Sequence, residues 1–462
     1  MRNVLWLCGL VPAIRPSVAP ADLDTASLDV NRWRMCITNF GVFGHDVRRS
    51  TAGGEWPGGT GHMYVYGAGL WIGALVGDTY TVVGYNPNSG HWEHTPGDSV
   101  GGVNDSLVRI YRYPDRWPAP QSRFPHAPQD VRSDQDAWRC FNDFDTTFHE
   151  PGNHPRRSLG IQVYETDYAS AGYLVRDFIY LRYEIENQRS DSLKDVYLGI
   201  AMDPDIGNAN DDYCRMYYHH GFVRGPGDTV YCDNLACAFS EPQVGWDTTG
   251  TVAVELIRTP GNRGASAMKV FTFGTGPVGD QKQYLALAGY NWWLNPPVYD
   301  PVDSLDSTPN DKQFLVSTGP FDLAPGQSES LVAVVLAVNT DPNVDPLRIA
   351  EAAWRAESIY FAGPHIGIET PDRPIVSEAP VELLAVPNPF TDQLKLRLSG
   401  PARSTGHIEI RDVTGRLVQV IPFLSGVSTY LWDGRDRSRD RVPSGVYFIR
   451  AGNYAAKVIR KD

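Results

Sequence analysis

The chain has 462 residues, of which 54 are acidic and 41 are basic, and its formal net charge is −13. Hydrophobic residues make up 42% and charged residues 21%, which excludes a chain that is disordered throughout. The acidic charge, without a long Lys/Arg run, excludes a typical nucleic-acid-binding protein. No stretch reaches the ~18 apolar residues of a membrane helix, so no membrane span is expected.

The N-terminus has the order of a secretory signal peptide. A positive charge at Arg2 precedes an apolar run over residues 4–11, and Ala19-Pro20-Ala21 offers a small-residue cleavage site. This order predicts a signal peptide over residues 1–21, and therefore export. A frayed cytosolic terminus is the alternative.

Residues 22–365 are expected to form one or two β-rich domains, because 44 glycines and 35 prolines indicate short elements joined by turns. The clearest strand covers residues 179–186, where Ile179, Leu181 and Tyr183 alternate with polar residues. A turn and a second alternating run at 196–200 predict a hairpin. Further strands are expected at residues 161–168, 251–258, 268–273, 284–288 and 330–338. Such a series predicts a mainly β fold, an antiparallel β-sandwich-like region.

One helix is predicted near residues 345–361. Asp345 is a good N-cap, and Pro346 suits the first helical position. Apolar residues then repeat every three or four positions, at Ile349, Ala353, Ala356 and Tyr360. Residues 366–380 contain three prolines and little to bury, so they are interpreted as a stiff linker before a separate domain at 381–462.

Seven short strands are predicted in this last domain, and that number suits a small immunoglobulin-like (Ig-like) β-sandwich. The expected strands cover residues 381–386, 394–398, 407–412, 417–420, 430–433, 446–450 and 455–460.

Four ordered motifs in the same residues carry a family resemblance. They are Pro387-Asn388-Pro389-Phe390, Asp412 with Gly415 and Arg416, Trp432-Asp433-Gly434, and Pro443-Ser444-Gly445 with Tyr447, before a final strand that contains Lys457. Together they resemble the type IX secretion C-terminal sorting domain, and equally the Ig-like domain of flagellar hook-capping proteins. The family usually has a glycine shortly after the Trp-Asp-Gly turn, where residues 437–441 stand here.

This resemblance implies a bacterial protein that is secreted or held at the cell surface, with the secretion machinery as a partner of the C-terminal domain. The remainder of the chain, through residues 321–327 and the loop at 203–212, resembles uncharacterised secreted proteins that end in such a domain. That group implies no activity.

An acidic loop is the first candidate for a metal site. The sequence places four aspartates and two asparagines within ten residues, namely Asp203, Asp205, Asn208, Asn210, Asp211 and Asp212. Calcium prefers 6–8 oxygen ligands, and flexible acidic loops supply them. The spacing is not that of an EF-hand, and a solvated turn is the alternative.

Other candidate ligands are weaker. His91, Glu93 and His94 lie among turn residues, so they are expected to be surface polar residues rather than a metal cluster. Several tryptophans fall in loop-like sequence and could form a platform for glycans. They are Trp56, Trp71, Trp92, Trp117, Trp138, Trp292 and Trp293.

No common nucleophile or phosphate-binding motif is present, so no catalytic residue can be named. The leading function is an exported surface protein that binds a glycan or a surface protein, or that forms part of a surface structure. The alternative is a secreted hydrolase acting on polysaccharide or peptide through two carboxylates.

Overall fold

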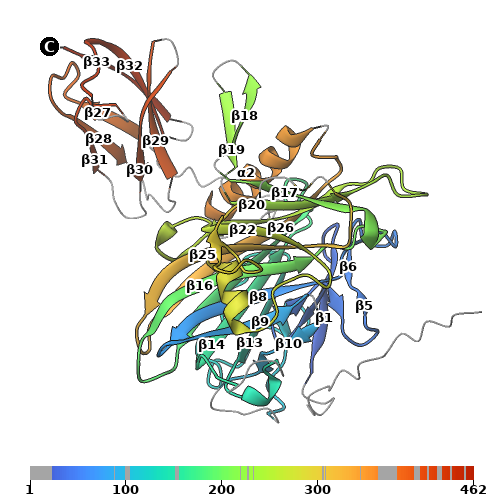
Figure 1. Ribbon diagram of the computed structural model, residues 1–462. Helices are drawn as coiled ribbons and strands as arrows, with labels where there is room; N and C mark the ends of the chain where they lie inside the picture. The colour runs from blue at the N-terminus through green and yellow to red at the C-terminus, as the bar shows by residue number, and fades with distance from the viewer. Residues whose placement is uncertain are drawn as a thin grey trace, which may run out of the picture.

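A computed structural model describes most of the chain (Figure 1). The described residues are 23–87, 89–98, 105–150, 156–218, 220–225, 228–232, 234–303, 306, 308–343, 345–362, 382–399, 406–413, 416–423, 429–436, 440–451 and 454–461. The predicted signal peptide at 1–21, the linker at 366–380 and Gly415 lie outside them. No helix in these ranges is long and apolar enough to cross a membrane.

Two large antiparallel sheets form the region up to residue 362, as the fold-class prediction requires. The first has eleven described strands: β1 (Thr25–Leu28), β2 (Arg34–Thr38), β3 (Val42–Phe43), β6 (Gly54–Glu55), β7 (Met63–Val65), β8 (Gly67–Val76), β9 (Thr79–Asn86), β10 (His91–Trp92), β16 (Leu193–Asp203), β22 (Ala267–Thr272) and β25 (Lys312–Leu323). The second has nine: β11 (Thr95–Pro96), β12 (Tyr111–Arg112), β13 (Gln135–Asn142), β14 (Ile161–Ala169), β15 (Phe178–Asn187), β17 (Asp212–Tyr217), β20 (Leu235–Ser240), β21 (Thr251–Arg258) and β26 (Ser328–Val338).

Short ribbons and 3-10 turns complete this region. The ribbons pair β4 (His45–Asp46) with β5 (Thr51–Ala52), β18 (His220–Gly225) with β19 (Asp228–Cys232), and β23 (Tyr290–Asn291) with β24 (Val298–Tyr299). The turns are η1 (Thr146–Phe148), η2 (Ala209–Asp211) and η3 (Pro260–Asn262).

One hydrophobic core is shared by the two sheets. Leu181 and Tyr183 of β15 point into it, as the alternation in the sequence predicts, and Leu198 and Ile200 of β16 meet them from the other sheet. All four side chains are almost completely buried. Burial of this kind contributes roughly 1.5–3 kcal/mol for each large apolar side chain.

The predicted hairpin of residues 179–186 and 196–200 is wrong. β15 pairs with β14 and β26, whereas β16 pairs with β8 and β25 in the opposite sheet. From Leu198 to Asp203 every residue of β16 is buried, which suits a central strand. Crossing between the sheets lets both strands direct their apolar faces into the same core.

The strand expected at residues 284–288 is also wrong, because residues 284–287 belong to helix α1 (Asp280–Leu287) and Ala288 is its C-cap. Tyr284 and Leu287 pack on the outer face of the first sheet. A Cβ atom on Gly73 would lie only 2.7 Å from Leu287 Cδ1, so this glycine permits the close approach of the helix. Periodicity cannot separate a helix from a strand in an apolar run this short.

The predicted helix is α2 (Pro346–Ala362), which packs on the outer face of the second sheet (Figure 1). Ile349, Ala353 and Ala356 are buried against that face. The hydroxyl of Tyr180 on β15 donates a hydrogen bond of 3.0 Å to the carbonyl of Ala356. The small alanines let the helix lie close to the sheet.

The C-terminal residues form two further antiparallel sheets around their own core. One contains β27 (Glu382–Val386), β28 (Leu394–Ser399) and β31 (Thr429–Trp432); the other contains β29 (Gly406–Asp412), β30 (Leu417–Phe423), β32 (Gly445–Ala451) and β33 (Tyr454–Arg460). All seven strands follow the expected positions to within a few residues.

Candidate functional site

Three aspartates from two distant parts of the sequence lie together at the end of the first sheet. Asp203 ends β16, Asp205 follows it, and Asp311 directly precedes β25. One carboxylate oxygen of each residue lies within 4.8 Å of those of the other two. Met202 of β16 is paired with Phe314 of β25. If this antiparallel register is extended beyond the ends of the two strands, Asp205 lies opposite Asp311.

Burial strongly affects these carboxyl groups. Asp203 is only 5% exposed, and its Oδ1 atom has no hydrogen-bond partner among the described residues. Loss of solvent raises its pKa well above the usual range, and the charge of Asp205 raises it further. Burial and the charge of Asp311 raise the pKa of Asp205 to about 7. Burial also raises the pKa of Asp311.

This geometry suits a shared cation. Calcium binds oxygen atoms at about 2.3–2.6 Å, so two ligands on opposite sides of the ion can lie about 5 Å apart. Lys312, next to Asp311 in the sequence, forms an ion pair of 2.8 Å with Asp306 instead. A cation would favour the ionised form of all three carboxylates and offset their mutual repulsion.

The other predicted ligands do not join the cluster. Asn208 caps η2, and its side chain donates a hydrogen bond of 2.8 Å to Asp211. Gln243 donates to the Asp211 carboxylate at 3.1 Å. Asp212 is completely buried, and burial raises its pKa to about 10. These residues therefore shape the loop, while Asp311, which no pattern in the sequence singles out, is the third carboxylate of the cluster.

The expectation that Glu93 and His94 lie on the surface is wrong, since each is only 2% exposed. The Glu93 carboxylate accepts hydrogen bonds from the backbone N–H groups of Glu150, at 2.7 Å, and Gly84, at 3.2 Å. Burial raises the pKa of Glu93 well above its usual range and lowers that of His94 to about 3. Glu93 thus joins two chain segments inside the fold.

The tryptophans do not form one exposed platform. Four of the seven are buried, namely Trp56, Trp71, Trp138 and Trp292. Trp293 is 56% exposed. Among the cysteines that the structure describes, Cys232 and Cys237 are not joined by a disulfide.

In the C-terminal unit the motif residues brace the two sheets. Trp432 is 1% exposed and lies between Phe390 and Tyr447, with ring centroids 5.3 Å from each. The Trp432 indole N–H donates to the carbonyl of Arg435 at 2.8 Å, across the turn at Gly434, whose φ of +69° favours glycine.

The other motif residues tie loops to strands. Asn388 donates to the carbonyl of Lys457 at 2.8 Å and accepts from the N–H of Ile459 at 2.9 Å. The Tyr447 hydroxyl donates to the carbonyl of Pro443 at 2.6 Å. Arg416 and Asp412 form an exposed ion pair of 2.9 Å. The conformation of this unit thus depends on the motif residues themselves.

Comparison with known families agrees with the resemblance of the C-terminal motifs. Residues 385–461 match the secretion system C-terminal sorting domain. The protein is therefore secreted or attached to the cell surface, and its C-terminal domain interacts with the type IX secretion machinery. A comparison of the sequence with curated proteins finds no match.

Several solved structures share a remote likeness with the chain. A putative aldose 1-epimerase from Escherichia coli K12 is 9% identical, with a TM-score of 0.30, over 69% of this chain and 100% of that one. A galactose mutarotase-like protein from Clostridium acetobutylicum is 8% identical, with a TM-score of 0.28, over 69% and 98% of the two chains. A polysaccharide lyase is 10% identical, with a TM-score of 0.28, over 95% and 46%. Sequence identities and TM-scores this low give no information about function.

Proposed function

We propose that this is a surface-exposed binding or surface-structural protein. The β-rich region up to residue 362 has the binding or structural role, and the Ig-like C-terminal domain directs secretion or attachment. The match of residues 385–461 to the sorting domain is the observation that carries this proposal. In the proposed route the predicted signal peptide is removed close to Asp22.

Binding is favoured over the alternative, a secreted hydrolase of polysaccharide or peptide. Glycoside hydrolysis usually needs two carboxyl groups about 5–9.5 Å apart, on either side of a substrate. One carboxylate oxygen of each of Asp203, Asp205 and Asp311 instead lies within 4.8 Å of those of the other two. Such an arrangement supports a cation ligand set rather than a catalytic pair.

We propose calcium as that cation. Three carboxylates supply hard oxygen ligands, and the unpartnered Oδ1 atom of the buried Asp203 is an independent reason to expect a ligand there. Calcium would join the end of β16 to the start of β25, and so stabilise the β-rich region.

Delivery to the surface tests the main proposal. The full chain and a chain that lacks residues 381–462 are expressed in a host that has the type IX machinery, and surface protein is measured by protease accessibility. We expect the truncated chain to stay inside the envelope while its circular dichroism still shows folded β structure. Normal surface delivery of the truncated chain would contradict the proposal and favour an accessory adhesive domain.

Binding and turnover are then compared on the purified full chain. The protein is incubated with a mixed glycan panel, and glycan binding and the release of reducing ends are measured in parallel. This comparison separates the two functions. Binding without turnover supports the proposed role. Turnover that is lost when a carboxylate is replaced by its amide would favour the hydrolase.

A further inference from the structure

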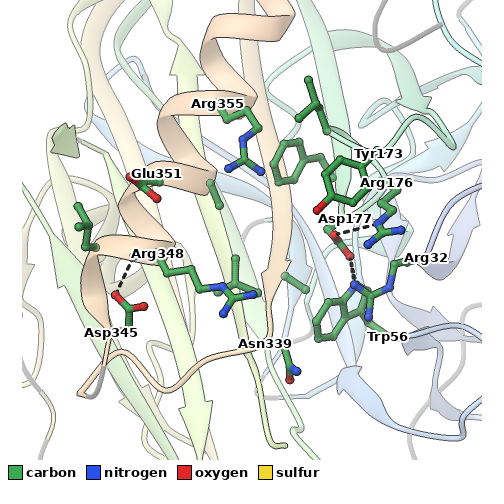
Figure 2. A pocket seen from close by; sticks show the side chains of 16 residues that line it. Arg32, Trp56, Tyr173, Arg176, Asp177, Asn339, Asp345, Arg348, Glu351 and Arg355 are labelled. Carbon is green, nitrogen blue, oxygen red and sulfur yellow. Dashed lines mark hydrogen bonds and ion pairs between the residues drawn. The ribbon is translucent and has the colours of Figure 1, made fainter. Parts of the chain in front are cut away.

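A pocket of about 390 Å³ lies between α2 and the turn that precedes β15 (Figure 2). The ends of β15 and β26 also line it, through Phe178 and Val338. Four arginines and three acidic residues, Asp177, Asp345 and Glu351, line the pocket, in a chain whose net charge is −13. The arginines are Arg32, Arg176, Arg348 and Arg355.

Asp177 organises one wall of the pocket. Its Oδ1 atom accepts a hydrogen bond of 2.8 Å from the Trp56 indole and forms an ion pair of 3.0 Å with Arg32. The Arg32 guanidinium lies 4.6 Å above the Trp56 ring, which fixes its orientation. The Nε atom of Arg176 lies 3.9 Å from the other Asp177 oxygen. Because two guanidinium groups share one carboxylate, this wall keeps a positive excess.

The helix forms the opposite wall. Arg348, Glu351 and Arg355 are spaced by three and four residues, so they lie on one face of α2. Figure 2 shows both arginine side chains reaching from the helix into the pocket. Neither forms an ion pair with another described residue. Asp345, at the end of this wall, accepts a hydrogen bond of 3.2 Å from the backbone N–H of Arg348.

We infer that this pocket binds an acidic sugar residue, with the arginines holding its carboxylate. A guanidinium group presents paired N–H donors that match the two oxygens of a carboxylate. At the rim, Tyr173 is 70% exposed and Leu174 is 56% exposed, and these side chains offer an apolar surface to the face of a sugar ring. The volume lies within the ~300–1,000 Å³ range of small-ligand sites.

This inference rests on the proposed binding function and names its ligand class. The two proposals can be tested separately, because delivery of the protein to the cell surface does not depend on the pocket. The arginines of the helix wall are also separate from the core, so they can be replaced without removing buried side chains.

Calorimetric titration of the full chain with a galacturonate trisaccharide tests the inference. The probes for comparison are the neutral galactose trisaccharide, inorganic sulfate and an Asp/Glu-rich peptide. We expect saturable binding of the uronate and none of the neutral sugar. The double variant Arg348→Gln/Arg355→Gln should weaken uronate binding about ten-fold or more, since it removes charge-assisted hydrogen bonds.

Two further variants keep the result interpretable. Arg258→Gln removes an exposed arginine from β21 and should leave uronate affinity unchanged. Leu174→Ala should weaken uronate binding while leaving any sulfate binding intact, because sulfate has no ring to contact; Tyr173 is kept, since the Arg176 guanidinium lies 4.7 Å from the centroid of its ring. Equal affinity for the uronate and neutral sugars, binding of the peptide but not the uronate, or an equal loss in Arg258→Gln would each overturn the inference.

Discussion

Arg139 and Glu165 face each other across β13 and β14, with 2.7 Å between Arg139 Nη2 and a Glu165 carboxylate oxygen, and neither side chain is exposed. Asp167 contacts the same guanidinium group from the next inward position of β14. One buried cation therefore serves two carboxylates. Burial raises the pKa of both acids, although the charge of Arg139 acts in the opposite direction.

Replacing Arg139 with methionine should destabilise the fold by about 3–5 kcal/mol, because it leaves two buried carboxyl groups without their cation. Urea denaturation at about pH 7 measures this loss in the free energy of unfolding. The loss should shrink in acid, where both carboxyls are neutral. The triple variant Arg139→Met/Glu165→Met/Asp167→Leu should recover most of the stability, since it removes the charges together. An Arg139→Met protein as stable as the wild type would contradict this role of Arg139.

Calcium should raise the thermal stability of the β-rich region, because a ligand bound only by the folded state stabilises that state. The gain is about 2.7 kcal/mol when free calcium is a hundred times the dissociation constant. Differential scanning calorimetry in calcium and in EDTA measures it. The double variant Asp203→Ala/Asp205→Ala should lose the calcium response, whereas Asp247→Asn, at an exposed site, should keep it. Identical curves for the wild type in calcium and EDTA would show that the loop is only a turn.

In EDTA the stability should also depend on the ionisation of Asp205. The folded pKa of this group is about 7, above the ordinary value of 3.8. Its contribution to stability is therefore fully present below about pH 4 and is lost as the pH rises through about 7, with an upper bound of roughly 4 kcal/mol. Urea titrations at about pH 5 and pH 8 should show a smaller loss in Asp205→Asn than in the wild type. Saturating calcium should reduce the difference, since the ion binds the ionised carboxylate. An equal loss in both proteins would rule out this role for Asp205.

The sorting domain should depend on the packing of Trp432. Trp432→Ala removes a buried ring between Phe390 and Tyr447, at a cost of about 3–5 kcal/mol. Limited proteolysis should then cut residues 382–461 sooner, and surface delivery should fall. The neighbouring Leu431 is 60% exposed, so Leu431→Ala should change the free energy of unfolding by no more than ~0.5 kcal/mol. Full delivery of a Trp432→Ala protein with a protease-sensitive domain would show that the machinery reads only the local sequence.

Elements with a strong local pattern could be predicted from the sequence. The alternation at Ile179, Leu181 and Tyr183 specifies a half-buried strand, since a period of two allows one face to be buried. Asp345 and Pro346 similarly mark the start of α2. In the C-terminal domain, turn residues and apolar runs alternate within a short span, so all seven strands could be placed from local signals.

Long-range packing, by contrast, sets which strands share a sheet and which carboxylates lie together. β15 and β16 are neighbours in sequence, but burial of both in one core places them in opposite sheets. Asp311 joins Asp203 and Asp205 because β16 and β25 pair across more than a hundred residues. The arginine pocket likewise combines a turn before β15 with the face of α2. Local periodicity carries no information on such long-range pairing, because the register is set by how the sheets pack.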